Sequence, residues 1–418
     1  MQVLFSPQPS TLDREFPCDV ILRYCRIFSG VSLYSGKPLE KLETELVFAG
    51  DIGDGSCSQG NAVKIAGGLG LITGEWEAYG DGMTADSPLI PGAKVTFNNV
   101  VEMADYIRSN QKPVGSFVFK GTVIGSSPSS PKVASFSSRG PNLITPEIFK
   151  PDVIAPGLNM LAAWTGAAAP SGLEVEKRRV AFNIRSGTSM SCPHVSGLAA
   201  MLRKAHPTWS PAAIKSALMT TAYNADNAGK QITDQASGNI STPFEHSAGH
   251  VDPNKALNPG LIYDILPSDY VAFLCSIGYN RKQMSLFIKD MKVDCRLNKL
   301  AAGPDDLNYP SFSVVFNSSN DNSVVKYKRV VTNVGRLGVT TYRVKVNSPP
   351  SVKISVSPSL LVFISINQKL SYEVTFTSLN NDAEMEFGAI EWNNGVHVVR
   401  SPVAITWQAS TTSLISSF

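Results

Sequence analysis

Apolar residues recur at the helical spacing twice in the middle of the chain. The first stretch carries an apolar stripe at positions i, i+3, i+4 and i+7: Val195, Leu198, Ala199 and Leu202. The second opens with Ser210 as the predicted N-cap and Pro211 at the first helical position. Its own stripe is Ile214, Ala217, Leu218 and Thr221. Each stripe predicts an amphipathic helix that packs one face against a core.

Towards the end of the chain the pattern changes to a period of two. Apolar and polar side chains alternate within residues 342–346, 372–376 and 403–407. Successive side chains of a strand point to opposite faces of a sheet. Short strands of this kind, separated by Gly, Pro and Asn, therefore predict a β-sandwich.

The first third of the chain is less regular. A helix is predicted at residues 63–66, where Gly67 would end it ahead of a buried strand. Another helix is predicted around residues 100–110. The turn-rich stretch SSPSSP at 126–131 is expected to return the chain to a different domain.

Composition excludes several classes of function. The 418 residues are 43% hydrophobic and 17% charged, as in ordinary globular proteins. A net charge of +3 without a basic block gives no support for nucleic-acid binding. No apolar run is long enough to predict a membrane span. The six cysteines show no zinc-type spacing, and no metal or organic cofactor is implied.

The string SGTSMSCPH at 186–194 carries the candidate chemistry. It places Ser189, preceded by Gly187, at the start of the first predicted helix. A helix N-terminus carries partial positive charge and free N–H groups, which stabilise an oxyanion. A serine hydroxyl becomes a strong nucleophile only when an imidazole takes its proton. The alternative is that Ser189 serves only as a helix cap, a role for which serine is favoured.

The whole stretch from 186 to 222 resembles the nucleophile helix of subtilisin-like serine proteases, in the form found in plant subtilases. Four further strings resemble the same family in the expected order: VASFSSRGPN at 133–142, KPDVIAPGLNMLAAW at 150–164, SAGHVDPNKALNPGLIYDI at 247–265 and DLNYPSF at 306–312. The resemblance implies that Ser189 is the nucleophile of a serine endopeptidase that cleaves peptides or proteins through an acyl-enzyme. It also implies that the Ser189 N–H is one donor of the oxyanion hole. His194 is expected to point into the helix packing as a structural histidine, not to act as the base.

The family's other catalytic groups have no counterpart in the sequence. An Asp in a DTG-type motif, a His in an HGTH-type motif and an oxyanion Asn in a GNSGP-type motif are all absent. Losing the catalytic histidine costs about 10⁶-fold in turnover in a bacterial subtilisin. We therefore expect this chain alone to be inactive, and neither His246 nor His250 is expected to replace the base. A truncated non-catalytic binding module and a pseudoenzyme are the alternative functions.

The resemblance also predicts the domain organisation. The fold class is an α/β subtilisin-like catalytic domain, C-terminal half only, with an insert and a C-terminal fibronectin III-like β-sandwich. Residues 1–40 are expected to be a stub of the catalytic domain and 41–120 a shortened protease-associated (PA) insert. Residues 121–285 would be the C-terminal half of the catalytic domain, and 306–410 the fibronectin III-like domain. The insert lacks a strand pair that the family carries, which predicts an open sheet edge or apolar face.

Secretion is implied by the resemblance, which places the protein outside the cell, in the apoplast, although the opening MQVLFSPQPS is not a signal peptide. Sequons at Asn239 and Asn317 suit a secreted glycoprotein. Cys275 and Cys295 form a disulfide if the protein is secreted, and a pair of buried free thiols is the alternative. The expected partner is a peptide or protein substrate, with no nucleic acid and no membrane. The sequence predicts no oligomeric state.

Overall fold

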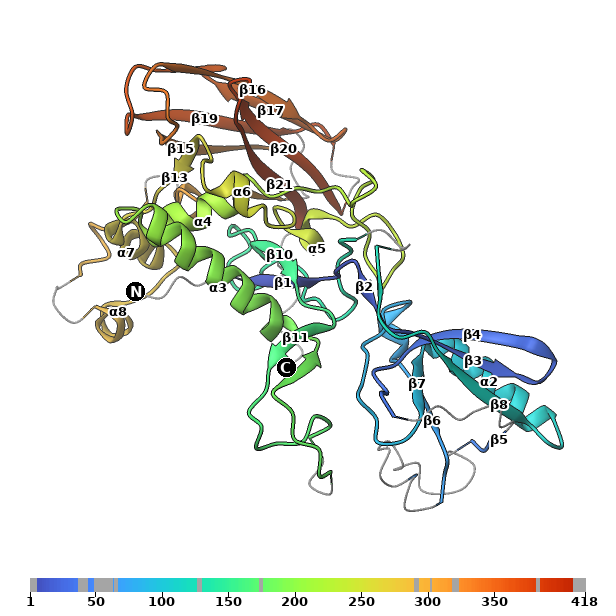
Figure 1. Ribbon diagram of the computed structural model, residues 1–418. Helices are drawn as coiled ribbons and strands as arrows, with labels where there is room; N and C mark the ends of the chain where they lie inside the picture. The colour runs from blue at the N-terminus through green and yellow to red at the C-terminus, as the bar shows by residue number, and fades with distance from the viewer. Residues whose placement is uncertain are drawn as a thin grey trace.

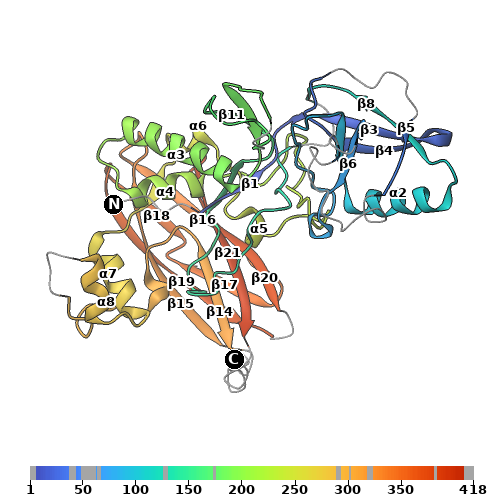
Figure 2. The ribbon, with the colours of Figure 1, turned by 90° about the horizontal axis from the view of Figure 1, so that it is seen from below.

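The computed structural model describes residues 6–36, 44–48, 63, 67–125, 130–172, 176–288, 293–300, 303–317, 323–380 and 384–408. Three bodies make up the molecule: a sheet with helix α2, a central part around helices α3 and α4, and a β-sandwich (Figure 1). In the view from below, the sheet and α2 lie at one end, away from the sandwich strands (Figure 2). Within the described ranges, no helix has the length and apolar character that a membrane crossing requires.

Six strands form the sheet of the first body, in the order β5-β8-β3-β4-β7-β6. Their bounds are β3 Pro17–Leu22, β4 Arg26–Val31, β5 Thr44–Glu45, β6 Leu71–Gly74, β7 Gly92–Val95 and β8 Val114–Phe119. Helix α2, Phe97–Ser109, confirms the helix predicted around 100–110, and its Met103 and Tyr106 are buried in the core that it shares with the sheet. Strand β6 follows Gly67 as predicted, but it is half-buried and not buried. The helix predicted at 63–66 falls mostly outside the described residues.

The boundary expected at residue 40 does not coincide with the edge of this sheet. Strands β3 and β4 come from residues assigned to the catalytic stub, yet they form the middle of the sheet, where β3 pairs with β8 and β4 with β7. The physical reason is the alternation in β3, which buries Cys18, Val20 and Leu22 on one face. Because the sheet and α2 provide the rest of that apolar core, the sheet begins at Pro17.

The sheet is an insertion into the central part. Strand β1, Pro7–Ser10, pairs in parallel with β10, Val153–Pro156, in the central part. Strands β2, Arg14–Glu15, and β9, Val123–Ile124, then pair antiparallel as the chain leaves and returns. The pairing of β1 with β10 thus brings together the chain before the inserted sheet and the chain after it.

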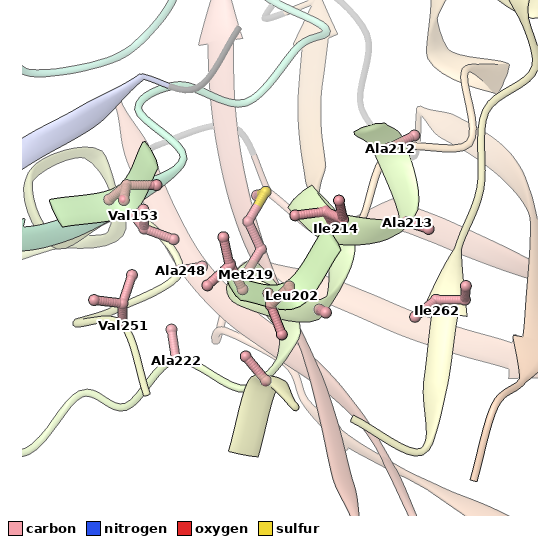
Figure 3. Close-up of a cluster of buried hydrophobic side chains, with 14 of the residues drawn as sticks. Val153, Leu202, Ala212, Ala213, Ile214, Met219, Ala222, Ala248, Val251 and Ile262 are labelled. Atoms are coloured by element: carbon pink, nitrogen blue, oxygen red, sulfur yellow. The ribbon is translucent and has the colours of Figure 1, made fainter. Parts of the chain in front are cut away.

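Helices α3, Thr188–Ala205, and α4, Pro211–Thr220, confirm the two helices predicted from the apolar stripes. In α3, Val195 and Leu202 are buried, and Leu198 and Ala199 pack partly buried against the same core. Ser210 caps α4 as predicted, since its side chain accepts a hydrogen bond from the Ala213 N–H at 3.0 Å. Helix α4 is buried on nearly all sides, at the centre of the cluster in Figure 3.

Two sheets form the sandwich, in the orders β13-β15-β19-β17 and β14-β21-β20-β16-β18. The bounds are β13 Leu261–Tyr263, β14 Phe312–Asn317, β15 Val324–Asn333, β16 Thr340–Asn347, β17 Val352–Ser357, β18 Leu360–Phe363, β19 Lys369–Ser378, β20 Met385–Asn393 and β21 Val398–Gln408. The three alternating stretches predicted as strands lie in β16, β19 and β21. The sandwich predicted from them is therefore confirmed.

Strand β13 adds a segment from before residue 306, where the sandwich was expected to begin, to one of its sheets. It comes from the segment assigned to the catalytic domain, but it pairs antiparallel with β15. The Tyr263 hydroxyl lies 2.6 Å from the Tyr372 hydroxyl and 3.1 Å from Ser401 Oγ, inside the sandwich. This buried contact explains why residues 261–263 join the sandwich and not the helices that flank them in sequence.

Shorter elements complete the described chain. They are β11 Met160–Ala163, β12 Phe182–Arg185, α5 Pro243–His246, α6 Pro253–Ala256, α7 Pro267–Ser276, α8 Arg281–Phe287 and the 3₁₀ turns η1 Arg23–Cys25, η3 Glu77–Tyr79 and η4 Pro304–Asp306. Strands β11 and β12 form an antiparallel ribbon that projects from the central part (Figure 1). Strand β12 leads directly into the loop before Ser189.

Candidate active site

Ser189 is the second residue of α3, and its side chain is exposed. Gly187 is the N-cap, with φ at 154°, a backbone conformation that side chains with a Cβ rarely adopt. Because the first N–H groups of a helix have no acceptor within it, the Ser189 N–H can donate to another group. The helix end therefore presents a hydroxyl and a nearby N–H donor, with the positive end of the dipole behind them.

The first turn of α3 is fixed to the loop that follows β10. Ser191 Oγ donates to the Ala155 carbonyl at 2.9 Å, and the Gly187 N–H donates to the Gly157 carbonyl at 2.9 Å. Gly157 is needed for this approach, because a Cβ there would lie 2.3 Å from Ser191 Oγ. These contacts hold the backbone on both sides of Ser189.

Ser191 and Asn159 hold the loop and first turn around Ser189, but the sequence did not identify either residue. Ser191 is fully buried, and Asn159 is 6% exposed and hydrogen-bonded to Ser186. The only signal in the sequence was the position of small and polar residues within APGLN and SGTSMS. That signal does not reveal which residues of the two strings meet.

His194 does not pack into the helix as expected. Its side chain is exposed, and its Nδ1 lies 2.7 Å from the carbonyl oxygen of Met190, one turn earlier in α3. The side chain of residue i+5 is directed away from Ser189 around the helix, so the prediction that His194 is not the base stays consistent with this geometry.

His246 and His250 are buried and face other groups. His246 Nδ1 lies 2.9 Å from Ser241 Oγ, and the His250 ring packs against Tyr223 with the centroids 5.1 Å apart. Burial lowers the pKa of each imidazole to about 4, so both are neutral at physiological pH. Among the described residues, no histidine makes a hydrogen bond to Ser189.

In the described parts of the chain, no group of three or more His, Cys, Asp or Glu side chains lies close enough together to hold a metal ion.

The remaining candidate residues are two cysteines and two asparagines. The sequence left Cys275 and Cys295 open between a disulfide and free thiols, and the structure joins them by a disulfide that ties α7 to residue 295. Asn239 is exposed. The side chain of Asn317 lies outside what the structure describes.

Comparison with known proteins defines the class to which this fold and site belong. Residues 87–240 match a family model described as Subtilase family, and residues 306–405 match one described as Fibronectin type-III domain. Subtilisin-like protease SBT1.4 of Arabidopsis thaliana is 50% identical over 431 residues, covering 95% of this chain and 55% of that protein. SBT1.7 and SBT1.3 from the same plant are 46% and 42% identical, each over 95% of this chain.

The chain belongs to the subtilase family of subtilisin-like serine proteases, as its sequence predicted. Its sandwich is a fibronectin type-III domain. The chain spans about half the length of the curated relatives that it matches, at 55% of SBT1.4 and 56% of SBT1.7.

Proposed function

We propose that Ser189 is the nucleophile of a serine endopeptidase that hydrolyses peptide bonds of protein or peptide substrates through an acyl-enzyme. The observation that carries the proposal is the exposed Ser189 side chain at the start of α3, within the residues that match the Subtilase family. Its hydroxyl oxygen attacks the substrate carbonyl, and its backbone N–H donates to the oxyanion that forms. The chemistry uses no metal or organic cofactor.

Under this proposal, the chain itself contains no base that accepts the hydroxyl proton of Ser189. The triad Asp and His and the second oxyanion donor, an Asn, are proposed to be supplied by residues other than these 418. Two observations support this: the motifs for those groups are absent from the sequence, and the described histidines bind elsewhere. The isolated chain is therefore proposed to be inactive.

The proposal that this chain holds only part of a catalytic domain has support in the packing. On α3, Met201 is 68% exposed, and Ser189 and Pro193 are exposed as well. Strands β1 and β10 form a parallel pair with no third strand among the described residues. Parallel sheets are normally covered on both faces, so further structure is expected to cover α3 and extend the pair.

The six-stranded sheet with α2 is proposed to be the shortened PA insert, because it enters and leaves the central part through the β2–β9 ribbon. We also propose that the protein is extracellular and glycosylated at Asn239 and Asn317. The exposed position of Asn239 and the Cys275–Cys295 disulfide support an oxidising, extracellular setting.

The test uses a biotinylated fluorophosphonate, which reacts with a serine only when a base activates it. The 418-residue chain, its Ser189→Ala variant and the protein isolated from its natural source are treated side by side. Peptides 186–203, released by trypsin, are then sequenced by mass spectrometry. We expect Ser189 to be labelled in the natural protein and unlabelled in the isolated chain.

Two outcomes would contradict the proposal. An unlabelled Ser189 in the natural protein, under conditions that label a control protease, favours the non-catalytic module or the pseudoenzyme. Labelling of Ser189 in the isolated chain means that a base within these residues completes the site, and His194→Gln would then identify or exclude the nearest candidate in sequence.

A further inference from the structure

Asn159 lies where three parts of the molecule meet. It sits in the loop between β10 and β11, is 6% exposed, and has φ at 55°. Its Oδ1 accepts from the Ala85 N–H at 3.0 Å and from Ser186 Oγ at 3.1 Å. Its backbone N–H donates to Ser186 Oγ at 2.8 Å, and its carbonyl accepts from Arg14 Nη2 at 2.7 Å. One buried residue thus binds the inserted sheet's loop, the strand that enters the insert, and the loop before Ser189.

The contacts on one side reach the loop that leads to Ser189. Ser186, held at its hydroxyl by Asn159, stands three residues before Ser189. The next residue, Gly187, donates its N–H to the carbonyl of Gly157, two residues before Asn159. The loop from 157 to 159 therefore holds two consecutive residues of the loop that leads into α3.

The contacts on the other side reach the inserted sheet. Ala85 follows Thr84, whose N–H and hydroxyl both donate to Glu75, at 3.2 and 3.1 Å. Glu75 is buried, and its own N–H donates to the carbonyl of Val95 at the end of β7. Lys94 of β7 donates to Thr84 Oγ1 at 3.0 Å and pairs with Glu75 at 3.7 Å. The loop at 84–85 is fixed to the sheet before it reaches Asn159.

We propose that Asn159 is a positioning residue that couples the inserted sheet to the Ser189 loop. The inference rests on the proposed role of Ser189, but the coupling itself needs no catalysis. A single oxygen, Asn159 Oδ1, serves both Ala85 and Ser186, so a displacement of the 84–86 loop changes the hydrogen bond that orients Ser186. A cavity lies between this loop and β12, next to these hydrogen bonds, and its lining includes Asp86, Lys94 and Arg185. A ligand or partner that moves the inserted sheet would thereby alter the presentation of Ser189.

The chain offers variants that separate this role from simple support of the fold. Asn159→Gly keeps the left-handed backbone, which glycine adopts without strain, and removes only the side chain. Asn159→Asp keeps an oxygen acceptor for both donors. Asn367→Gly is the matched control, because Asn367 also has a positive φ, of 63°, and is exposed in the sandwich.

The experiment measures amide hydrogen exchange residue by residue in the 418-residue chain. Asn159→Gly is expected to speed exchange of the Ala85 amide, which loses its acceptor, and of the Gly187 amide, about tenfold each. Asn159→Asp should restore both rates, and Asn367→Gly should change neither. Glu75→Ala, which removes the acceptor of both Thr84 hydrogen bonds and so loosens the loop from the insert side, should also speed exchange at Gly187.

Each other outcome would overturn the coupling. Faster exchange at Ala85 alone means that the two hydrogen bonds act independently, and a uniform rise across the central part means that Asn159 only supports the fold. Failure of Asn159→Asp to restore the rates would remove the shared acceptor as the cause. None of these readings depends on whether Ser189 reacts with a fluorophosphonate, so failure of the proposed function remains a separate result.

Discussion

Tyr309, in the segment that leads into the sandwich, donates its hydroxyl hydrogen to the carboxylate of Asp152, just before β10. Asp152 is fully buried, with Lys150 Nζ at 2.8 Å and Lys215 Nζ at 3.6 Å from its oxygens. Burial alone would raise the pKa of Asp152, but the two ammonium groups and the hydrogen bonds outweigh it and lower the pKa to about 2. This cluster therefore joins the segment before β14 to β10, the strand whose Ala155 carbonyl accepts a hydrogen bond from Ser191 in the first turn of α3.

Neutralising Asp152 should destabilise the central part. In Asp152→Asn, two partly buried ammonium groups lose their buried counter-charge, and the expected loss is about 3 kcal/mol in the free energy of unfolding. Urea unfolding monitored by tryptophan fluorescence measures the change. The control is Asp294→Asn, which removes a carboxylate from an exposed ion pair with Arg296 and should leave the midpoint unchanged. An equal effect of the two substitutions would contradict the buried-cluster interpretation.

The Asp152 carboxylate also predicts an acid limit to stability. Because its folded pKa is below the unfolded value, its contribution is complete above about pH 4. The contribution is lost as the pH falls from there towards 2, where the folded carboxyl takes up a proton. The free energy of unfolding should therefore fall more steeply over this window in the unaltered chain than in Asp152→Asn, where Asp294 and Glu176 still have a lowered pKa.

His246 and His250 predict a second, milder pH dependence. Burial lowers the pKa of each to about 4, so the unfolded chain binds these protons first as the pH falls below about 6.5. Stability is therefore full above pH 6.5 and declines towards pH 4, by up to about 3 kcal/mol for each histidine. Unfolding midpoints at several pH values should show a flatter profile in His246→Gln and His250→Gln. An unchanged slope in both buried variants would contradict the prediction.

The Cys275–Cys295 disulfide should stabilise the small unit formed by α7 and α8. It closes a loop of 20 residues, for which the expected stabilisation is about 3 kcal/mol. Cys275→Ser is expected to open this unit before the rest of the chain, because Val271, Met284 and Val293 form a cluster of their own around the disulfide. Tryptic cleavage after the exposed Arg281 measures the opening. Cys192→Ser, which alters an exposed free thiol, should leave cleavage unchanged.

Two tyrosines test whether β13 belongs to the sandwich. Tyr263→Phe removes a hydroxyl that serves both Tyr372 and Ser401, and it should cost 1 to 3 kcal/mol, on the order of a buried group left unpaired. Tyr342 lies in the same core, but its buried hydroxyl has no hydrogen-bond partner in the described structure. Tyr342→Phe should therefore be neutral or stabilising. Equal losses for the two variants would mean that the hydroxyl of Tyr263 contributes nothing beyond its packing.

Sequence patterns predicted the helices and strands that depend on interactions between residues close together in the chain. The stripe around Val195 predicted α3, and Ser210 with Pro211 predicted the start of α4, because capping and amphipathic spacing act within a few residues. The alternation around Tyr342 and Tyr372 predicted sandwich strands for the same reason. The pattern could not show that strands before residues 40 and 306 join the inserted sheet and the sandwich, since that depends on which distant strands pair.

The sequence by itself determined the family, the presentation of Ser189 at a helix N-terminus, and the two classes of secondary structure. Only the tertiary structure decided that β3 and β4 belong to the inserted sheet, that β13 joins the sandwich, and that His194 is exposed. It alone brought Asn159 to Ala85 and Ser186, which are 74 and 27 residues away along the chain. The physical reason is that a helix stripe or a cap depends on neighbours in sequence. A strand partner or a shared hydrogen-bond acceptor depends on which distant segments share a buried face.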